Sequence, residues 1–439
     1  MIRTRARLAG LLIATLGLSA CATYRAKPLP DQPDLAAVIT LPVERLAVPV
    51  PVPDRIDPFR PLPEEAVVAL AVLNNPDLKA QRLRAGVAAA QVFAAGLLPD
   101  PQLAVGLSRS AEHQGFDLGL TEDLAAILTR GARRDAERAR ARQVNLDVLW
   151  QEWQVAARAR ELFIQVNLDR ELRPLLASER SILADRSRRE REAMQQGAAA
   201  AAAVDADAAA LASADARFRS AQLDENDADH ALHALLGLRP DVPLRLAPSR
   251  SVRLLSRADF DAALAALPRR RADLLALQAG YASGEGDLRA AILGEFPAIT
   301  VGVDRARSAE EGVRTSGGTV ALSLPLFNAN RGRIAIARAT RAELWQAYQA
   351  RLDEATVDAD RAWRATLLLT RQLHDLQAQL PALARTATAT EQAFRAGNLS
   401  LESYASLRPE YLAQQAAVIR ARAALAQAQS ALRVVLGRP

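Results

Sequence analysis

Two histidines three residues apart are the side chains of this sequence best suited to hold a metal ion. His230 and His233 stand beside Asp227 and Asp229. Residues three apart on a helix share one face, where imidazole and carboxylate groups can bind a single cation. The chain has only 4 histidines, however, and no third set of ligands accompanies this pair. We therefore interpret both as exposed helix residues and predict no metal site.

Catalytic chemistry finds no better support in the sequence. It contains no nucleophile motif, no phosphate-binding loop and no carboxylate pair with an identifiable acid and base. We expect no enzyme and no cofactor.

The basic character of the chain, with a formal charge of +6, raises the possibility of nucleic-acid binding. Arginines alternate with acids, however, as in the sequence RRDAER at 133–138. That alternation is typical of a solvated helix face. No aromatic residues are interleaved for base stacking, so we predict no nucleic-acid partner.

The one cysteine of the chain, Cys21, lies where a lipid anchor would be attached. Three arginines within the first seven residues precede the apolar run 8–18, which is the order of a secretory signal peptide. The sequence Leu18-Ser19-Ala20-Cys21 then resembles the bacterial lipobox, which implies that Cys21 carries acyl chains such as palmitate. Ala22 after the cysteine fits sorting to the outer membrane. The alternative is a cleavage site of small residues that happens to contain a cysteine.

Proline dominates the segment that follows, residues 22–63, with ten prolines between Pro28 and Pro63. Proline fixes φ and removes a hydrogen-bond donor, so this segment is expected to be extended. It reads either as a spacer that leads away from the anchor or as plain disorder.

The rest of the chain is an internal repeat. The same interval of 24 residues separates Asp77 from Pro101 and Asp273 from Pro297. A glycine, Gly197 or Gly397, precedes by 40 residues the glycine that ends the sequence ALHALLG or ALRVVLG. We therefore divide the chain into a first copy at 64–240, a connector at 241–259 and a second copy at 260–439.

Each copy changes its hydrophobic period twice. Apolar residues recur at helical spacing over 64–98, and then Leu103, Val105 and Leu107 alternate with small or polar residues as in a strand. The second copy repeats this alternation at Ile299, Val301 and Val303. A polar loop and a second alternating segment follow in both copies, which predicts two hairpins.

Very long helices are expected over about 124–196 and 330–396, each followed by a glycine turn and a shorter helix. About 70 residues of helix span roughly 100 Å, far more than a globular domain. Alanine-rich seams let such helices pack closely as coiled coils. Pro174 and Pro381 are expected to kink or break them. The helices would form either a tube or a solid structural rod.

Four strands of about nine residues suit a tilted membrane wall with lipid on one side and water on the other. Four strands cannot close a barrel, and open sheet edges are not tolerated in hydrocarbon, so several copies would have to share one barrel. The alternative is two hairpins packed on a soluble core.

The junction between hairpin and long helix carries a specific resemblance. The segment Leu322 to Gly332, LSLPLFNANRG, and its looser counterpart Leu120 to Gly131 resemble the TolC-like outer-membrane factor family. The resemblance covers about 64–439. It implies a mainly α fold with a small β part: a homotrimer in which long coiled-coil helices form an α-barrel and each chain adds four strands to a shared β-barrel. It also implies outer-membrane lipid around the barrel, and as partners a periplasmic adaptor protein and an inner-membrane pump.

The family resemblance also places candidate sites at the two helix turns. The second turn, Gly397-Asn398-Leu399-Ser400, follows the family pattern for the periplasmic tip that meets the adaptor. The first, at Gly197, has become a run of alanines, which implies a weaker adaptor contact. Two acids near these turns, Glu402 and Asp205, are candidate carboxylates of a channel mouth, or ordinary charges of a helix surface.

The function this implies is that of an outer-membrane channel in a tripartite efflux or type I secretion-like system. The chain would be a passive exit duct, while the pump selects the cargo, whether metal ions, drugs or a secreted protein. The alternative is a lipid-anchored periplasmic coiled-coil scaffold without a pore.

Overall fold

The computed structural model describes residues 24–40, 60–109, 114–249, 254–309, 311 and 313–438. The chain divides into two units, residues 1–35 and 36–439. The described part of the first unit, residues 24–35, is exposed and contains neither helix nor strand. Cys21, the apolar run 8–18 and much of the proline-rich segment lie outside the described residues.

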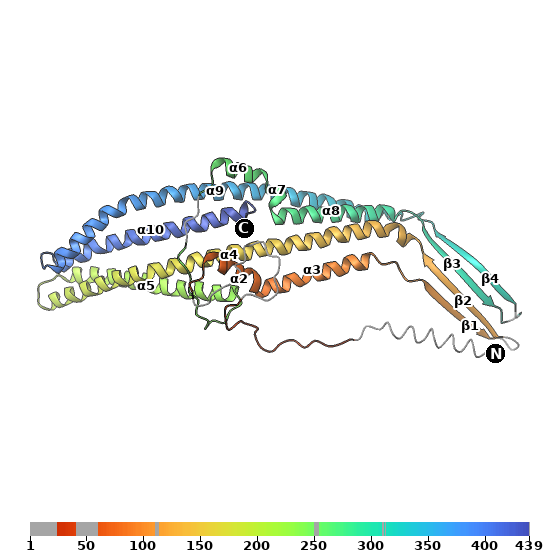
Figure 1. Ribbon diagram of the computed structural model, residues 1–439, viewed down its shortest axis with the longest axis horizontal. Helices are drawn as coiled ribbons and strands as arrows, with labels where there is room; N and C mark the ends of the chain where they lie inside the picture. The colour runs from red at the N-terminus through yellow and green to blue at the C-terminus, as the bar shows by residue number, and fades with distance from the viewer. Residues whose placement is uncertain are drawn as a thin grey trace. The chain divides into compact units, whose positions relative to one another are not determined.

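The second unit is mainly helical with one small antiparallel sheet, as predicted (Figure 1). Long helices run side by side, and the sheet projects from one end of them. The strands are β1 (Gln102–Arg109), β2 (Gln114–Asp123), β3 (Ala298–Arg307) and β4 (Arg314–Ser323). The helices are α2 (Glu64–Asn74), α3 (Pro76–Ala95), α4 (Ala125–Gln195), α5 (Ala201–Leu235), α6 (Arg257–Ala265), α7 (Leu267–Arg270), α8 (Ala272–Leu293), α9 (Arg331–Arg395) and α10 (Leu401–Val435).

The helix expected over 64–98 is two helices. Asn75 has φ −52° and ψ 124°, because a residue that precedes proline is pushed out of the α region by Pro76. Its side chain then caps α3 by accepting a hydrogen bond from the Leu78 amide at 2.9 Å.

The long helices run through their prolines without a break. Pro174 lies inside the 71 residues of α4, and Pro381 lies inside the 65 residues of α9. A proline removes one backbone hydrogen bond and costs about 3 kcal/mol locally. The neighbouring turns are held by packing, since α4 lies against α5 and α9 against α10 (Figure 1). None of the helices among the described residues is both long and apolar enough to cross a membrane.

The two largest apolar clusters among the described residues lie near the middle of the long helices. In the first, the α2 run Ala66–Leu73 is buried throughout and packs with α4, α5 and the connector. In the second, α6 packs on α9, where the rings of Phe260 and Trp363 stack with centroids 4.8 Å apart. The N-terminal segment forms two bridges with the chain after α5, Ala36–Leu238 at the end of the first copy and Leu62–Leu246 in the connector.

Both copies use one device to fix the end of their last helix. Asn75 of the first copy donates a hydrogen bond to the Leu235 carbonyl at 3.2 Å, and Arg271 of the second donates to the Val435 carbonyl at 3.4 Å. Arg271 is buried and also binds Asp273. These bonds join the start and end of each copy.

Asp273 holds a second helix through Arg351, whose Nε lies 2.7 Å from its carboxylate. Burial would raise the pKa of Asp273, but the hydrogen bonds and charges of Arg271 and Arg351 together hold that pKa below its usual value. The carboxylate therefore stays ionised at neutral pH and ties α8 to α9.

Candidate channel wall and helix tips

The sheet has the strand order β1-β2-β3-β4, so both of its edges come from outer hairpin strands. Its register pairs Leu103 with Leu120, Leu120 with Val303, and Val301 with Val320. Directly paired residues of neighbouring strands point to the same face. The register therefore assigns every side chain of the sheet to one of two faces.

One face, here called the apolar face, collects almost every large apolar residue of the strands. Leu107 is 85% exposed and Val320 is 74% exposed, so this face is uncovered by the rest of the chain. Uncovered apolar area of this kind marks a surface that meets lipid or another protein. Its members are Leu103, Val105, Leu107, Phe116, Leu118, Leu120, Ile299, Val301, Val303, Val320 and Leu322.

The opposite face, the polar face, is made of small and hydrophilic residues. Asp304 accepts a hydrogen bond from the Thr319 hydroxyl at 3.3 Å on this face. Strands with one apolar and one polar face suit a wall between hydrocarbon and water. Its other members include Ala104, Gly106, Ser108, Asp117, Gly119, Thr121, Thr300, Gly302, Gly317 and Ala321.

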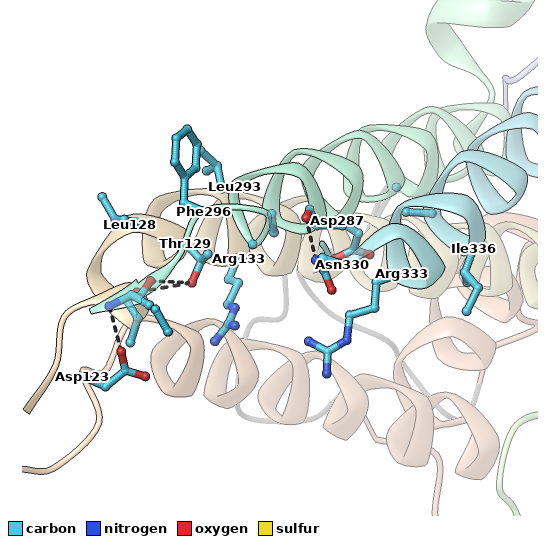
Figure 2. A pocket seen from close by; sticks show the side chains of 18 of the residues that line it. Asp123, Leu128, Thr129, Arg133, Asp287, Leu293, Phe296, Asn330, Arg333 and Ile336 are labelled. Carbon is cyan, nitrogen blue, oxygen red and sulfur yellow. Dashed lines mark hydrogen bonds between the residues drawn. The ribbon is translucent and has the colours of Figure 1, made fainter. Parts of the chain in front are cut away.

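The sheet joins the helices at a pocket of about 580 Å³ between the start of α4, the end of α8 and the start of α9 (Figure 2). Figure 2 shows Asn330 beside the end of α8, and its side chain donates a hydrogen bond to the Ala291 carbonyl at 2.6 Å. At the matching point of the first copy, the Asp123 carboxylate accepts from the Ala125 amide at 2.8 Å.

The junction motif LSLPLFNANRG has a structural reason for its asparagine. Ala329 and Asn330 have φ of 41° and 53°, the left-handed region, which asparagine tolerates better than most residues. This turn starts α9 beneath the sheet. Gly294 leaves the space the asparagine needs, since a Cβ there would lie 2.7 Å from its Nδ2.

The second helix tip, between α9 and α10, is closed by several contacts. Gly397 has φ 74°, and the Asn398 amide donates back to the Ala393 carbonyl at 2.9 Å, which is the Schellman arrangement. The Ser400 hydroxyl caps α10 by accepting from the Ser403 amide at 3.2 Å. Leu399 lies between Asn398 and Ser400.

An aromatic pair adds to this tip. The rings of Phe394 and Tyr404 stack across it with centroids 4.5 Å apart. They join the last turn of α9 to the first turn of α10.

The first helix tip, between α4 and α5, keeps the turn and lacks the cap. Gly197 has φ 75°, and the Ala198 amide donates to the Ala193 carbonyl at 2.8 Å. The N-cap of α5 is Ala200, whose side chain cannot accept a hydrogen bond. An ion pair between Arg186 and the buried Asp207 joins α4 to α5 two turns above the tip, with Nε 2.9 Å from Oδ2.

The two candidate mouth carboxylates are both exposed: Glu402 in the first turn of α10 and Asp205 in the first turns of α5. Neither forms an ion pair with another described residue. The acid that sequence reasoning missed is Asp207, because its partner Arg186 lies on another helix and no local signal links them.

The prediction that both histidines are exposed is confirmed for His230 and wrong for His233. His230 is exposed, whereas His233 is buried and has a carbonyl oxygen 2.7 Å from each ring nitrogen, Asp229 at Nδ1 and Val242 at Nε2. No group of three or more metal-ligating side chains is found among the described residues. His233 thus fastens the end of α5 to the connector.

Comparisons with known proteins agree with this geometry. Residues 264–438 match the family model described as outer membrane efflux protein. No curated protein matches the sequence.

Several solved structures share the fold. A membrane protein from Pseudomonas aeruginosa is 20% identical with a TM-score of 0.70, covering 91% of this chain and 97% of its own. The outer membrane channel CmeC from Campylobacter jejuni is 17% identical with a TM-score of 0.68, covering 85% of each chain. The outer membrane protein VceC from Vibrio cholerae is 16% identical with a TM-score of 0.67, covering 85% of this chain and 96% of its own. At these identities the likeness establishes the fold over most of the chain.

Proposed function

We propose, from the match of residues 264–438 to the outer membrane efflux protein family, that the whole chain is the exit duct of a tripartite efflux system. The duct crosses the outer membrane through its strands and extends into the periplasm through its helices. The energy for transport comes from the inner-membrane pump, which also selects the substrate.

The observation that carries this proposal is the two-faced sheet. A soluble protein would cover an apolar face that includes Leu107 and Val320, whereas here the face is open along all four strands. Lipid covers such a face at no cost in hydrogen bonds, and water fills the side lined by Asp117, Thr300 and Asp304.

The sheet also supports assembly as a homotrimer. β1 and β4 are edge strands whose outer backbone groups have no partner within the sheet. In hydrocarbon each unsatisfied group costs several kcal/mol. Joining β4 of one copy to β1 of the next satisfies these groups, and three four-stranded sheets make a closed wall of twelve strands.

The helices support a tube beneath that wall. The 71 residues of α4 extend about 106 Å at 1.5 Å per residue, a periplasmic reach that no compact domain needs. Large apolar side chains remain exposed along the helices, including Leu83, Phe93, Trp345 and Leu368. Neighbouring copies of the chain would cover them.

The tips are the contact points for the periplasmic adaptor in this proposal. The segment Gly397–Ser400 is the better ordered surface because it has the serine cap and the aromatic stack, whereas Gly197 offers only the turn. Glu402 and Asp205 would then stand near the mouth of the channel.

The N-terminal part of the proposal is a signal peptide at 1–21, acylation of Cys21 and a spacer at 22–63. The remainder is the two copies, 64–240 and 260–439, with their connector 241–259. A mass of the mature chain that includes acyl groups on Cys21 is the expected result of mass spectrometry. An unmodified cysteine would contradict this part alone.

A pair of neighbouring substitutions tests the wall. Val301 lies on the apolar face and Thr300 on the polar face. Val301→Arg should reduce recovery of the protein in outer-membrane fractions, since an arginine facing lipid costs about 2–4 kcal/mol at the midplane. Thr300→Arg should still assemble. If both variants behave like the unmodified protein, the sheet is no membrane wall and the scaffold function replaces the duct.

A further inference from the structure

The apolar face ends in arginines on the side of the sheet away from the helices. Arg109 continues the face on β1, Arg305 and Arg307 continue it on β3, and Arg314 continues it on β4. Each keeps the two-residue alternation of the apolar residues on its own strand, so these side chains lie on the same face of the sheet. We call these four residues the arginine rim.

The rim brings like charges together. Arg307 is paired directly with Arg314 across the β3–β4 ladder. Like charges that face each other across strands destabilise a sheet unless something neutralises them.

Within the described part of the chain, no acidic group neutralises the charges of the rim. No ion pair with a described carboxylate is formed by any of the four guanidinium groups, and the buried Nε of Arg307 has no hydrogen-bond partner there. Glu311, on the β3–β4 loop, donates its amide to the Ser308 hydroxyl and makes no ion pair with the rim. The acids Asp117, Asp123 and Asp304 lie on the polar face, and the one acid of the strands on the apolar face, Glu122, pairs with Val301 at the end of the sheet away from the rim.

Resting on the proposed function, we propose that the arginine rim binds the phosphate groups of anionic lipids in the outer leaflet. The rim lies on the lipid side of the wall, at the level where the apolar band ends and headgroups begin. A guanidinium group binds phosphate through two parallel hydrogen bonds. Neighbouring strands about 4.8 Å apart hold such groups in a fixed row.

The chemistry of the rim differs from that at the other end of the wall. There the apolar face carries an acid, Glu122, and the segments beyond the strands expose the aromatic and aliphatic side chains of Phe296, Leu326 and Phe327. The rim therefore makes the two ends of the wall unequal and favours an orientation with the loops in the more anionic leaflet.

Lipid retention tests this binding. The purified protein is reconstituted into nanodiscs of phosphatidylcholine with a minor fraction of phosphatidylglycerol, and the lipids that remain bound after extraction are quantified by native mass spectrometry. We expect phosphatidylglycerol to be enriched over its bulk fraction. The triple variant Arg305→Gln, Arg307→Gln, Arg314→Gln should lower that enrichment by at least about fivefold, since each arginine near an anionic surface contributes roughly that factor.

Two matched variants control for net charge and for folding. Arg338→Gln, Arg371→Gln and Arg385→Gln remove the same charge from exposed positions of α9 and should keep the enrichment. Lysines in place of the three rim arginines should keep most of it. Equal enrichment in the rim variant and the unmodified protein would overturn the inference, because the arginines would then be solvated by water alone. Equal loss in the α9 variant would overturn it as well.

Conductance measurements on the same samples distinguish a failure of lipid binding by the rim from a failure of the proposed channel function. Conductance in bilayers of pure phosphatidylcholine does not depend on anionic lipid, so the rim variant should still conduct there. A conducting rim variant with unchanged lipid enrichment contradicts only the rim. An unmodified protein that conducts in neither lipid contradicts the proposed function.

Discussion

His233 joins the last turn of α5 to the connector. Both ring nitrogens face carbonyl oxygens, so both must carry protons for both contacts to be hydrogen bonds. The hydrogen bond with the Asp229 carboxylate is the main reason that the pKa of His233 rises to about 9, against the effect of burial. The protonated ring is therefore the form that the fold stabilises.

Because His233 is protonated in the folded protein, its contribution to stability is expected to depend on pH. The folded pKa of about 9 lies above the ordinary value of 6.5, so the stabilisation is complete below about pH 6.5 and is lost as the pH rises through 9. His233→Ala leaves the buried Val242 carbonyl without a donor and should cost about 1–3 kcal/mol at pH 6. Thermal unfolding followed by circular dichroism should show this difference shrink at pH 10. His230→Ala, at an exposed position, is the control and should unfold like the unmodified protein at both pH values.

At the residue scale the sequence predicted no metal site and could not assign this role to His233. Only the chemistry of the His230 and His233 pair was visible, together with the absence of further ligands. The Val242 carbonyl that holds His233 lies in an irregular segment whose path no periodicity predicts. The arginine rim was not predicted either, because the sequence indicated a polar loop after Val303, whereas β3 continues to Arg307.

The two helix tips differ in the N-cap of the helix that follows the turn, and this difference predicts different local stabilities. Ser400 caps α10, whereas Ala200 at the start of α5 caps nothing. Ser400→Ala should cost about 1 kcal/mol and Ala200→Ser should add a similar amount. Amide hydrogen exchange in the first turns of the two helices should therefore speed up about fivefold in the first variant and slow down in the second. Unchanged exchange in both would show that the caps do not stabilise the tips.

Close packing of α8 on α4 depends on Gly286. A Cβ at this position would lie 2.9 Å from the Cα and Cβ of Ala136, where the backbone cannot yield. Gly286→Ala should destabilise the fold by about 1–3 kcal/mol. Gly86, on α3, has nothing within 4 Å of the same position, so Gly86→Ala should stabilise its helix by about 0.5–1 kcal/mol. Denaturant unfolding measures both changes, and two effects of the same sign would contradict this packing.

At the element scale, periodicity and turn residues predicted most of the fold. The alternation at Leu103, Val105 and Leu107 predicted a strand, and Gly197 and Gly397 predicted turns because left-handed backbone favours glycine. The break at Asn75 was readable from Pro76. The continuity of α4 through Pro174 was not, because packing between helices compensates for the lost hydrogen bond and no local pattern reports that packing.

At the scale of the whole molecule, a single chain leaves two of its surfaces without partners. The edges of β1 and β4 and the open apolar face need partners that the chain does not supply to itself. In the proposed function, neighbouring copies supply the first and lipid supplies the second. The long helices would extend the same assembly away from the membrane, as a duct between two membranes requires.

Single-channel conductance of the purified protein in planar bilayers, with its mass determined in the same detergent, tests whether the chain forms a trimeric channel. We expect the mass of a trimer together with small, gated openings, because the shared wall and its helical tube form one water-filled path. A stable monomer without conductance would contradict it and leave a lipid-anchored coiled-coil scaffold as the function of this chain.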